Sequence, residues 1–263
     1  MIIPGYKPKP TFSCLMGAWP GMTVSLIHNG EAINYSGEIE MVYPSKYSAI
    51  NLLPELDLDK EKWSQIPSEE SIASTIKAIE KRGIRVVRLP DGNQALAKIK
   101  ELIPPGSEVM NGSSTTLIEI GFQELMDSGE HEWKDMKLMV TGENDAQKRA
   151  KIRRKTVTSD YFLSGVNAIA MTGELVGCDA TGSRVGAWPY GAGNLLLVAG
   201  TNKIVPSLDD ALRRIREYTF PLEDLRSRNV YGVPSKIGKC VILANESQPG
   251  RVTLLLIDES LGY

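Results

Sequence analysis

Apolar residues recur along the chain in two periods, and most of this pattern lies after residue 67. Ile72, Ile76 and Ile79 recur at helical spacing after Ser68, which can cap a helix, and Gly83 can end that helix. A continuous apolar run at residues 84–89 then predicts a strand. The chain therefore enters a regular alternation of helix and strand at this point.

The alternation continues toward the carboxyl terminus. Asp91 can cap a helix that Pro104 stops, and a short strand at residues 109–110 leads through a Gly/Ser/Thr loop into a helix over 117–126. The remaining elements are predicted as helices over 143–156 and 207–218 and closing strands over 241–244 and 252–257. This rhythm predicts an α/β fold, with an open, mostly parallel sheet and helices on both faces.

Strand ends and small polar loops are most concentrated in residues 159–205. Apolar runs at 161–163 and 166–171 flank Ser164-Gly165, and Thr172-Gly173 turns the chain back into 174–176, which is typical of a hairpin. A polar cluster follows at 179–184, and a buried-strand run at 195–199 ends in a loop that contains Lys203. Ligand crevices in open α/β sheets form at the carboxyl ends of strands, so we expect the chemistry of this chain here.

The first 62 residues have a different pattern. Residues 1–22 are rich in Pro and Gly without a period, and two alternating runs then flank Asn29-Gly30, which predicts a hairpin. Residues 38–43 can add a third strand. We expect a small β-rich appendage at 1–62, before a main domain at 63–263. It could be a lid or a subunit contact, or it could only cover a sheet edge, and the structural role is favoured.

Charge and composition exclude several classes of protein. The chain has 30 Lys and Arg against 32 Asp and Glu, so no global field favours nucleic acid or an anionic membrane. No apolar run approaches the ~18 residues of a spanning helix, and the amino terminus resembles neither a transit peptide nor a secretory signal. Cys14, Cys178 and Cys240 stand far apart, and the two histidines lack metal-ligand spacing. We expect a cytoplasmic protein without metal or cofactor.

The loop at residues 110–121 is the first candidate for chemistry. A strand that passes through Gly112, Ser113, Ser114 and Thr115 into a helix directs free N–H groups at one spot, which can hold a phosphate or carboxylate. The alternative is ordinary capping of the helix by a serine. A helix terminus contributes only about 0.3–1 kcal/mol, so the loop needs a partner such as Arg184, Lys203 or a basic helix.

A basic run at residues 148–155 is the second candidate, with six cations in eight positions. On a helix these charges spread around the circumference, which favours a solvated helix end whose charges complement its own carboxyl terminus. Arg149 or Arg153 could still turn into the crevice.

The chain from about residue 72 to residue 262 resembles the LUD domain family, the lactate-utilisation proteins of LutC/YkgG type. The resemblance rests on NGSSTTLIEIG, SDYFLSGVNAIAMTGELV, ATGSRVGAWPYG, GTNKIVPSLDDALRRIREY, PLEDLRSRNVYG and PGRVTLLLIDESLGY. It implies the fold grouped with ribose-5-phosphate isomerase, NagB and CoA transferases. It also implies a role in L-lactate oxidation beside iron–sulfur redox partner proteins. Some relatives carry a cysteine cluster near the carboxyl terminus; here Cys240 stands alone, so no iron–sulfur centre is assigned.

A more distant likeness concerns Asn167. The pattern from Asp160 through Gly165 to Gly173 is similar to a strand and turn of methylthioribose-phosphate isomerases, whose catalytic aspartate falls at the position of Asn167. An amide can orient a ligand but cannot replace a carboxylate base. Asn167 is therefore either a ligand-binding residue or a turn residue that bonds its own backbone.

Together these observations predict a crevice that binds a small anionic metabolite. Its expected lining is Gly112, Ser113, Ser114, Thr115, Gly165, Asn167, Thr181, Gly182, Ser183, Arg184 and Lys203. The first hypothesis is a component of lactate or hydroxy-acid utilisation that acts with redox partners. The alternatives are a self-sufficient isomerase or acyl/CoA transferase, and a sensing module without catalysis. A homo-oligomer is possible for all three.

Overall fold

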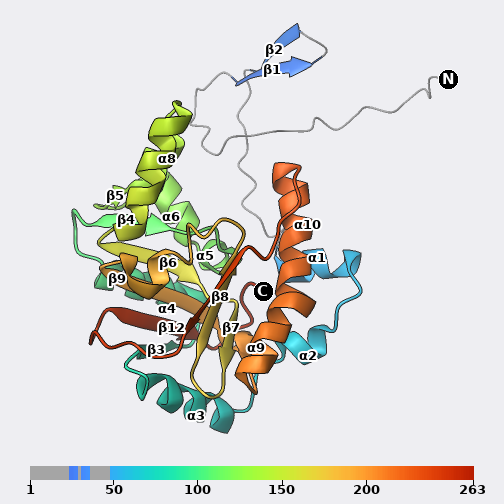
Figure 1. Ribbon diagram of the computed structural model, residues 1–263, viewed down its shortest axis with the longest axis vertical. Helices are drawn as coiled ribbons and strands as arrows, with labels where there is room; N and C mark the ends of the chain where they lie inside the picture. Colours follow the sequence, from blue (N-terminus) through green and yellow to red (C-terminus); the bar gives the residue numbers. More distant parts are fainter. Residues whose placement is uncertain (1–23, 29–30, 36–47) are drawn as a thin grey trace, which may run out of the picture.

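The main sheet consists of six parallel strands in the order β3-β12-β9-β6-β4-β5 (Figure 1). The computed structural model describes residues 24–28, 31–35 and 48–263. The strands are β3 (Arg85–Leu89), β12 (Val252–Ile257), β9 (Asn194–Gly200), β6 (Tyr161–Gly165), β4 (Glu108–Asn111) and β5 (Lys134–Asp135). This arrangement confirms the predicted open α/β fold, because every pairing within this sheet is parallel.

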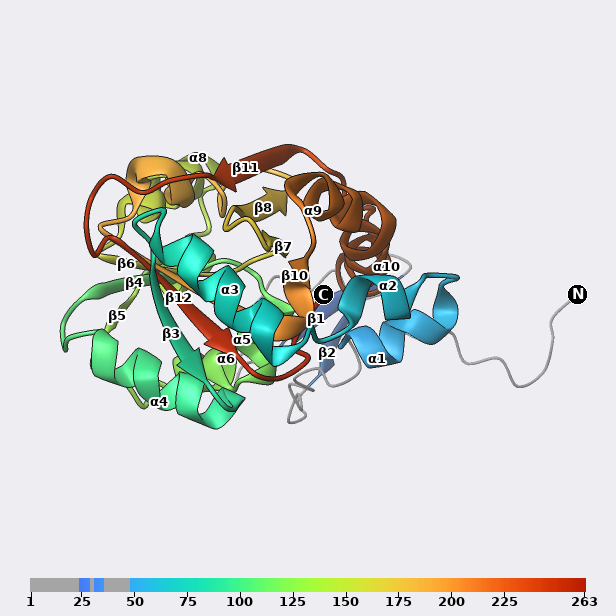
Figure 2. The ribbon, with the colours of Figure 1, turned by 90° about the horizontal axis from the view of Figure 1, so that it is seen from below.

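One face of the main sheet is covered by helices. These are α4 (Gly92–Leu102), α5 (Thr115–Glu119) and α6 (Phe122–Ser128). Ile99, Leu117 and Phe122 pack from these helices against Leu163 and Leu255 of the sheet, and all five side chains are buried. Helix α3 (Glu69–Glu80) lies on the opposite face, where its apolar stripe joins a second core cluster. Figure 2 shows α4 and α6 on one side of β12.

A second sheet, which the sequence did not predict as a separate layer, packs beside α3 on this opposite face. Its order is β10 (Ile204–Val205), β7 (Ala168–Ala170), β8 (Leu175–Asp179) and β11 (Lys239–Leu243). Strands β7 and β8 form the predicted antiparallel hairpin, and Gly173 supplies the positive φ of +102° that its turn requires. Strand β11 then joins β8 antiparallel.

The outer side of the small sheet is covered by the helices of the carboxyl-terminal third. They are α9 (Leu208–Arg214), a π-helical turn (Ile215–Thr219) and α10 (Phe220–Tyr231), which lie beside α1 (Ala49–Leu52) and α2 (Lys60–Ser64) (Figure 2). Leu52 and Trp63 are buried among these helices. The domain boundary at residue 62 stays a prediction.

Two predicted helices end elsewhere than expected. The helix over 117–126 is wrong as a single element, because Gly121 adopts φ +79° and separates α5 from α6. The helix expected over 207–218 does not stop at residue 218, since the π-helical turn leads directly into α10. Helix α7 (Met136–Thr141) was not predicted, and α8 (Ala146–Lys155) begins at its cap Asp145.

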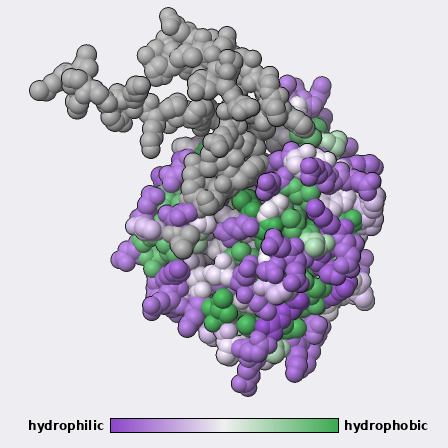
Figure 3. Space-filling model, turned by 180° about the vertical axis from the view of Figure 1, so that it is seen from behind, coloured by the Kyte–Doolittle hydropathy of each residue, from purple (hydrophilic) through white to green (hydrophobic). Residues whose placement is uncertain are grey.

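The amino-terminal hairpin pairs β1 (Val24–His28) with β2 (Glu31–Tyr35) antiparallel, and the Asn-Gly turn predicted between them lies outside the described residues. The third strand predicted at residues 38–43 lies outside the described residues. Within the described part of the chain, no helix is long and apolar enough to cross a membrane. Hydrophobic residues appear only in small separate groups on the face seen in Figure 3.

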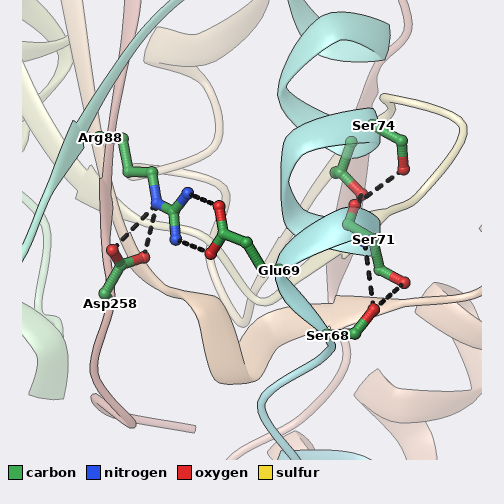
Figure 4. Close-up of polar contacts among 7 residues, drawn as sticks. Ser68, Glu69, Ser71, Ser74, Arg88 and Asp258 are labelled. Carbon is green, nitrogen blue, oxygen red and sulfur yellow. Dashed lines mark hydrogen bonds and ion pairs between the residues drawn. The ribbon is translucent and has the colours of Figure 1, made fainter.

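Surface ion pairs connect α3 to the main sheet at the carboxyl ends of β3 and β12. Arg88 donates to both oxygens of Glu69 at 2.5 and 2.6 Å and to both oxygens of Asp258 at 2.9 Å (Figure 4). Ser68 caps α3 by accepting from the amide of Ser71 at 3.3 Å. Pairs that water reaches contribute only about 0–1 kcal/mol, so these contacts orient α3 more than they stabilise it.

Candidate functional site

The loops that follow β4, β6 and β9 meet at the carboxyl edge of the main sheet, because these three strands are neighbours in it. Gly165 ends β6 directly beside Ser114, which caps α5 by accepting from the amide of Leu117 at 3.3 Å. A Cβ atom on Gly165 would lie 2.4 Å from the Oγ atom of Ser114. Glycine is therefore required for the two loops to approach this closely.

Arg184 crosses this edge from the loop after β8. Its side chain lies against Gly112, where a Cβ atom would fall 2.5 Å from the Arg184 Cδ. The guanidinium donates to the carbonyl of Gly165 at 2.6 Å, to the Ser164 hydroxyl at 3.2 Å and to the carbonyl of Cys178. These acceptors are all neutral. Burial lowers the pKa of Arg184, and the nearby charge of Asp179 opposes that shift.

Asn167 connects Arg184 to the second sheet. Its Oδ1 atom accepts from Arg184 Nη2 at 2.9 Å and from the amide of Cys178 at 2.8 Å, and its backbone carbonyl accepts from Arg214 Nη1. The side chain thus bonds the neighbouring strand rather than its own backbone. Its half-buried position between two arginines suits an orienting group.

Arg214 is a residue of the site that the sequence analysis missed. It is fully buried, and its Nε and Nη1 atoms donate to the Trp63 carbonyl at 2.7 Å and the Thr219 hydroxyl at 3.1 Å. Its Nη2 atom is buried without a hydrogen-bond partner among the described residues. Burial lowers the pKa of Arg214 to about 10. The signal was present, because Arg214 lies three residues after Ala211 on the apolar face of α9.

Lys203 completes a group of three cations at this edge. The side chain is buried, and its Nζ atom donates to the Thr116 hydroxyl at 2.8 Å. Its pKa is lowered to about 7, first by burial and then by the positive charges of Arg214 and Arg184, while Glu119 opposes the shift. We call Arg184, Lys203 and Arg214 the cationic cluster. Within residues 48–263, no carboxylate forms a salt bridge with any of them.

The carboxylates whose charges act on the cluster are engaged elsewhere. Asp179 accepts from the backbone amides of Gly182, Arg184 and Val185. Glu223 pairs with Arg226 at 2.7 Å. These groups moderate the positive potential of the cluster without a hydrogen bond to its side-chain nitrogen atoms.

The last three residues lie over the start of α5, which the sequence analysis did not anticipate. The amide of Gly262 donates to the carboxylate of Glu119 at 2.6 Å, and a Cβ atom on Gly262 would lie 2.4 Å from the Thr116 hydroxyl oxygen. Burial raises the pKa of Glu119, although the Gly262 amide and Lys203 oppose that shift. Lys203 therefore carries an amine that titrates nearer to neutral pH than usual, whereas the Glu119 side chain is exposed to solvent.

The remaining predicted residues lie around this cluster or turn away from it. Ser113 is exposed and Thr115 is half-buried at the start of α5. Thr181 and Ser183 face α8 instead, where Arg153 Nη2 donates to their hydroxyls at 3.3 and 3.0 Å. Gly182 lies between them with φ +92°. No residue of α8 is buried, which agrees with a solvated basic helix.

The opposite edge of the main sheet has a shallow depression of about 290 Å³ near the amino ends of β3 and β12. It is lined by Glu80, Gly83, Ile84, Arg85, Glu246, Pro249 and Gly250. Its lining contains no comparable group of buried charged side chains, so the cationic cluster is the better candidate for a functional site. Over the described ranges, no group of His, Cys, Asp and Glu has the arrangement of a metal site.

The fold and the cluster define an open α/β protein with two buried cations and one half-buried cation at the carboxyl edge of its parallel sheet. Residues 72–257 match the family model described as the LUD domain, so the chain belongs to the LUD domain family. This family is associated in general with lactate utilisation.

Two solved structures share a weaker similarity with the chain. A DUF162 family protein from Deinococcus radiodurans has 10% identity over 73% of this chain and 99% of that chain, with a TM-score of 0.44. A D-ribose-5-phosphate isomerase in complex with phospho-erythronic acid has 12% identity over 52% of this chain and 66% of that chain, with a TM-score of 0.27. No curated protein matches the sequence. The fold described above rests on the strand order, not on these similarities.

Proposed function

We propose that this protein binds a small anionic metabolite at the cationic cluster and takes part in the utilisation of L-lactate or a related hydroxy acid. The observation that supports the proposal is that Arg184, Lys203 and Arg214 are brought together, and over the described residues no carboxylate bonds the side chain of any of them. Buried charges are normally paired, since an isolated buried ion is costly. A bound carboxylate or phosphate would supply the missing negative charge.

The magnitudes favour the cluster over the loop as the main binding element. Helix α5 has only five residues, so its dipole adds little to binding. A hydrogen bond to a charged group contributes about 1.5–3 kcal/mol. Micromolar affinity corresponds to about 8 kcal/mol, which two or three such bonds from the cluster can approach. In this proposal Gly112 and Gly165 provide close approach, and Asn167 orients the ligand.

A hydroxy acid suits this site chemically. Its carboxylate would bond Arg214 Nη2, which lacks a partner among the described residues. Its hydroxyl would find Asn167 and Thr116, whose neutral side chains bond Arg184 and Lys203. We propose that the electrons of a hydroxy-acid oxidation pass to separate iron–sulfur partner proteins, as the resemblance to lactate-utilisation proteins implies.

A self-sufficient enzyme of the isomerase or acyl-transferase kind is the second candidate. Lys203 favours it, because its pKa is lowered to about 7 and its amine could take up or release a proton near neutral pH. Asn167 opposes an aldose–ketose isomerase, since an amide cannot act as the base. Turnover by the isolated protein would distinguish this candidate from a binding component.

The proposed binding is tested by thermal unfolding with L-lactate, pyruvate or phosphate, each compared with chloride at equal ionic strength. Saturating ligand should stabilise the unmodified protein, by about 2.7 kcal/mol at one hundred times Kd. Arg214→Met should lose this protection, whereas Arg216→Met should keep it, because Arg216 is exposed beside the same helix. Equal responses to these anions and to chloride would refute anion binding. Equal protection in both variants would refute its assignment to the cluster.

A further inference from the structure

Two cysteines that are 62 residues apart in the sequence lie opposite each other in the second sheet. Strand β11 pairs with β8 in a register that places Cys240 directly across from Cys178. Both thiols are free in the structure, and the side chain of Cys240 is close enough to act on the Cys178 thiol. These cysteines stand far apart in the sequence, and nothing in their spacing predicts the pairing of β8 with β11.

The pair occupies the kind of antiparallel position where side chains come closest. The amide of Cys178 donates to Asn167 Oδ1 at 2.8 Å, and its carbonyl accepts from Arg184. Both backbone groups of Cys178 therefore point away from β11, which makes Cys178 and Cys240 a non-hydrogen-bonded pair. Such pairs have Cα atoms about 4.5 Å apart. Disulfides span about 4.4–6.8 Å between Cα atoms, so a bond needs little backbone movement.

The two thiols differ in their surroundings. Cys240 is exposed, whereas Cys178 is half-buried. Burial raises the pKa of Cys178 to about 12, and the neighbouring Cys240 thiol adds to this shift. Oxidation therefore starts at Cys240, which solvent reaches, and Cys178 is the resolving thiol beside it.

We propose that Cys178 and Cys240 form a reversible disulfide when the protein meets a peroxide. The Cys240 sulfur attacks one peroxide oxygen, which breaks the O–O bond and gives a sulfenic acid and one water. The Cys178 sulfur then attacks the Cys240 sulfur, which forms the S–S bond and expels hydroxide; the Cys178 proton converts this hydroxide into a second water. One hydrogen peroxide thus takes two electrons from two thiols, and a dithiol reductant restores them.

This disulfide would lie against the candidate site. The backbone of Cys178 holds Asn167 through its amide and Arg184 through its carbonyl. Any adjustment of β8 that closes the S–S bond is therefore transmitted to these two side chains. The formation of the disulfide does not depend on the proposed function, but its effect on anion binding does.

The test treats reduced full-length protein with one equivalent of hydrogen peroxide and then maps the thiols by alkylation and mass spectrometry. Two of the three thiols of the chain should disappear, with a loss of about two mass units and a single peptide that links Cys178 to Cys240. Dithiothreitol should restore both thiols. Cys14→Ser should behave as the unmodified protein does.

The resolving role of Cys178 gives a second readout. In Cys178→Ser, Cys240 should stop at sulfenic acid, trapped with dimedone, or proceed to sulfinic acid. Stable sulfenic or sulfinic acid at Cys240 of the unmodified protein would overturn the proposal. A disulfide that involves Cys14, or one that joins two chains, would overturn it equally.

Discussion

The buried lysine of the site gives a prediction that needs no ligand. Lys203→Met keeps the length of the side chain and removes its charge. A lysine whose folded pKa lies below its unfolded value carries fewer protons in the folded protein over the interval between the two. Stability contributed through Lys203 therefore rises with pH across that interval. At lower pH the protonated amine remains buried and destabilises the fold.

The size of the effect follows from the two pKa values. The pKa of Lys203 is about 7, against an ordinary value of 10.5. Between these limits the free energy of unfolding should rise by at most about 1.4 kcal/mol per pH unit, or about 3 kcal/mol from pH ~7 to pH ~9. Below pH ~7 the penalty is constant, at an upper bound of about 5 kcal/mol. Lys203→Met has no buried charge and therefore lacks this penalty.

The measurement is urea unfolding of both proteins at several values between pH ~6 and pH ~9. Groups common to both proteins cancel in the difference. Lys203→Met should be the more stable at pH ~6, and its advantage should shrink steadily above pH ~7. A difference that stays constant over the whole range would show that Lys203 is charged throughout and would refute the reasoning.

Three further substitutions test the site. In Arg184→Lys the side chain has no planar group that can bond Gly165 and Asn167 together, so the binding free energy of the anion, measured by calorimetry, should weaken by about 1–3 kcal/mol. An unchanged affinity would exclude Arg184 from the site. Gly165→Ala places a Cβ atom 2.4 Å from Ser114 Oγ, so it should lower the free energy of unfolding in urea by about 1–3 kcal/mol. Gly142→Ala is the control, because its Cβ atom would lie 3.2 Å from the Leu138 carbonyl oxygen and should lower this free energy much less. Equal losses in the two variants would contradict the requirement for glycine at residue 165. Asn167→Asp puts a carboxylate between two arginines, so it should weaken anion binding. This variant should show at most a trace of sugar-phosphate isomerase activity. Robust turnover of a sugar phosphate by the unmodified protein, lost in Asn167→Ala, would favour the self-sufficient enzyme instead.

Much of the fold was readable from local signals. Ser68 and Asp91 cap the helices that the sequence assigned to them, and the apolar run at 195–199 is the buried strand β9. These signals act over a few residues, which is why pattern alone finds them. The second sheet depends on β11 pairing with β8 from about sixty residues away, and periodicity contains no information about such a partner.

The residues of the candidate site also fall into those that the sequence predicts and those that it does not. Gly112, Gly165, Asn167 and Lys203 meet because the parallel strands before them end at one edge, which topology predicts. Arg184 reaches this edge from the loop after β8 of the second sheet. Thr181 and Ser183 face α8, because the turn held by Asp179 directs only Arg184 inward. Arg214 was missed because residues 207–218 were predicted only as a helix, and no role was assigned to the cation among its apolar positions.

The central claim is that the cationic cluster binds a small anion, and calorimetric titration with L-lactate and with phosphate tests it most directly. We predict one site per chain, with an affinity that falls above pH ~7 as Lys203 loses its proton. We also predict that the heat of binding disappears in Arg214→Met and persists in Arg216→Met. No heat of binding with either anion in the unmodified protein, or identical titrations of the two arginine variants, would contradict the account.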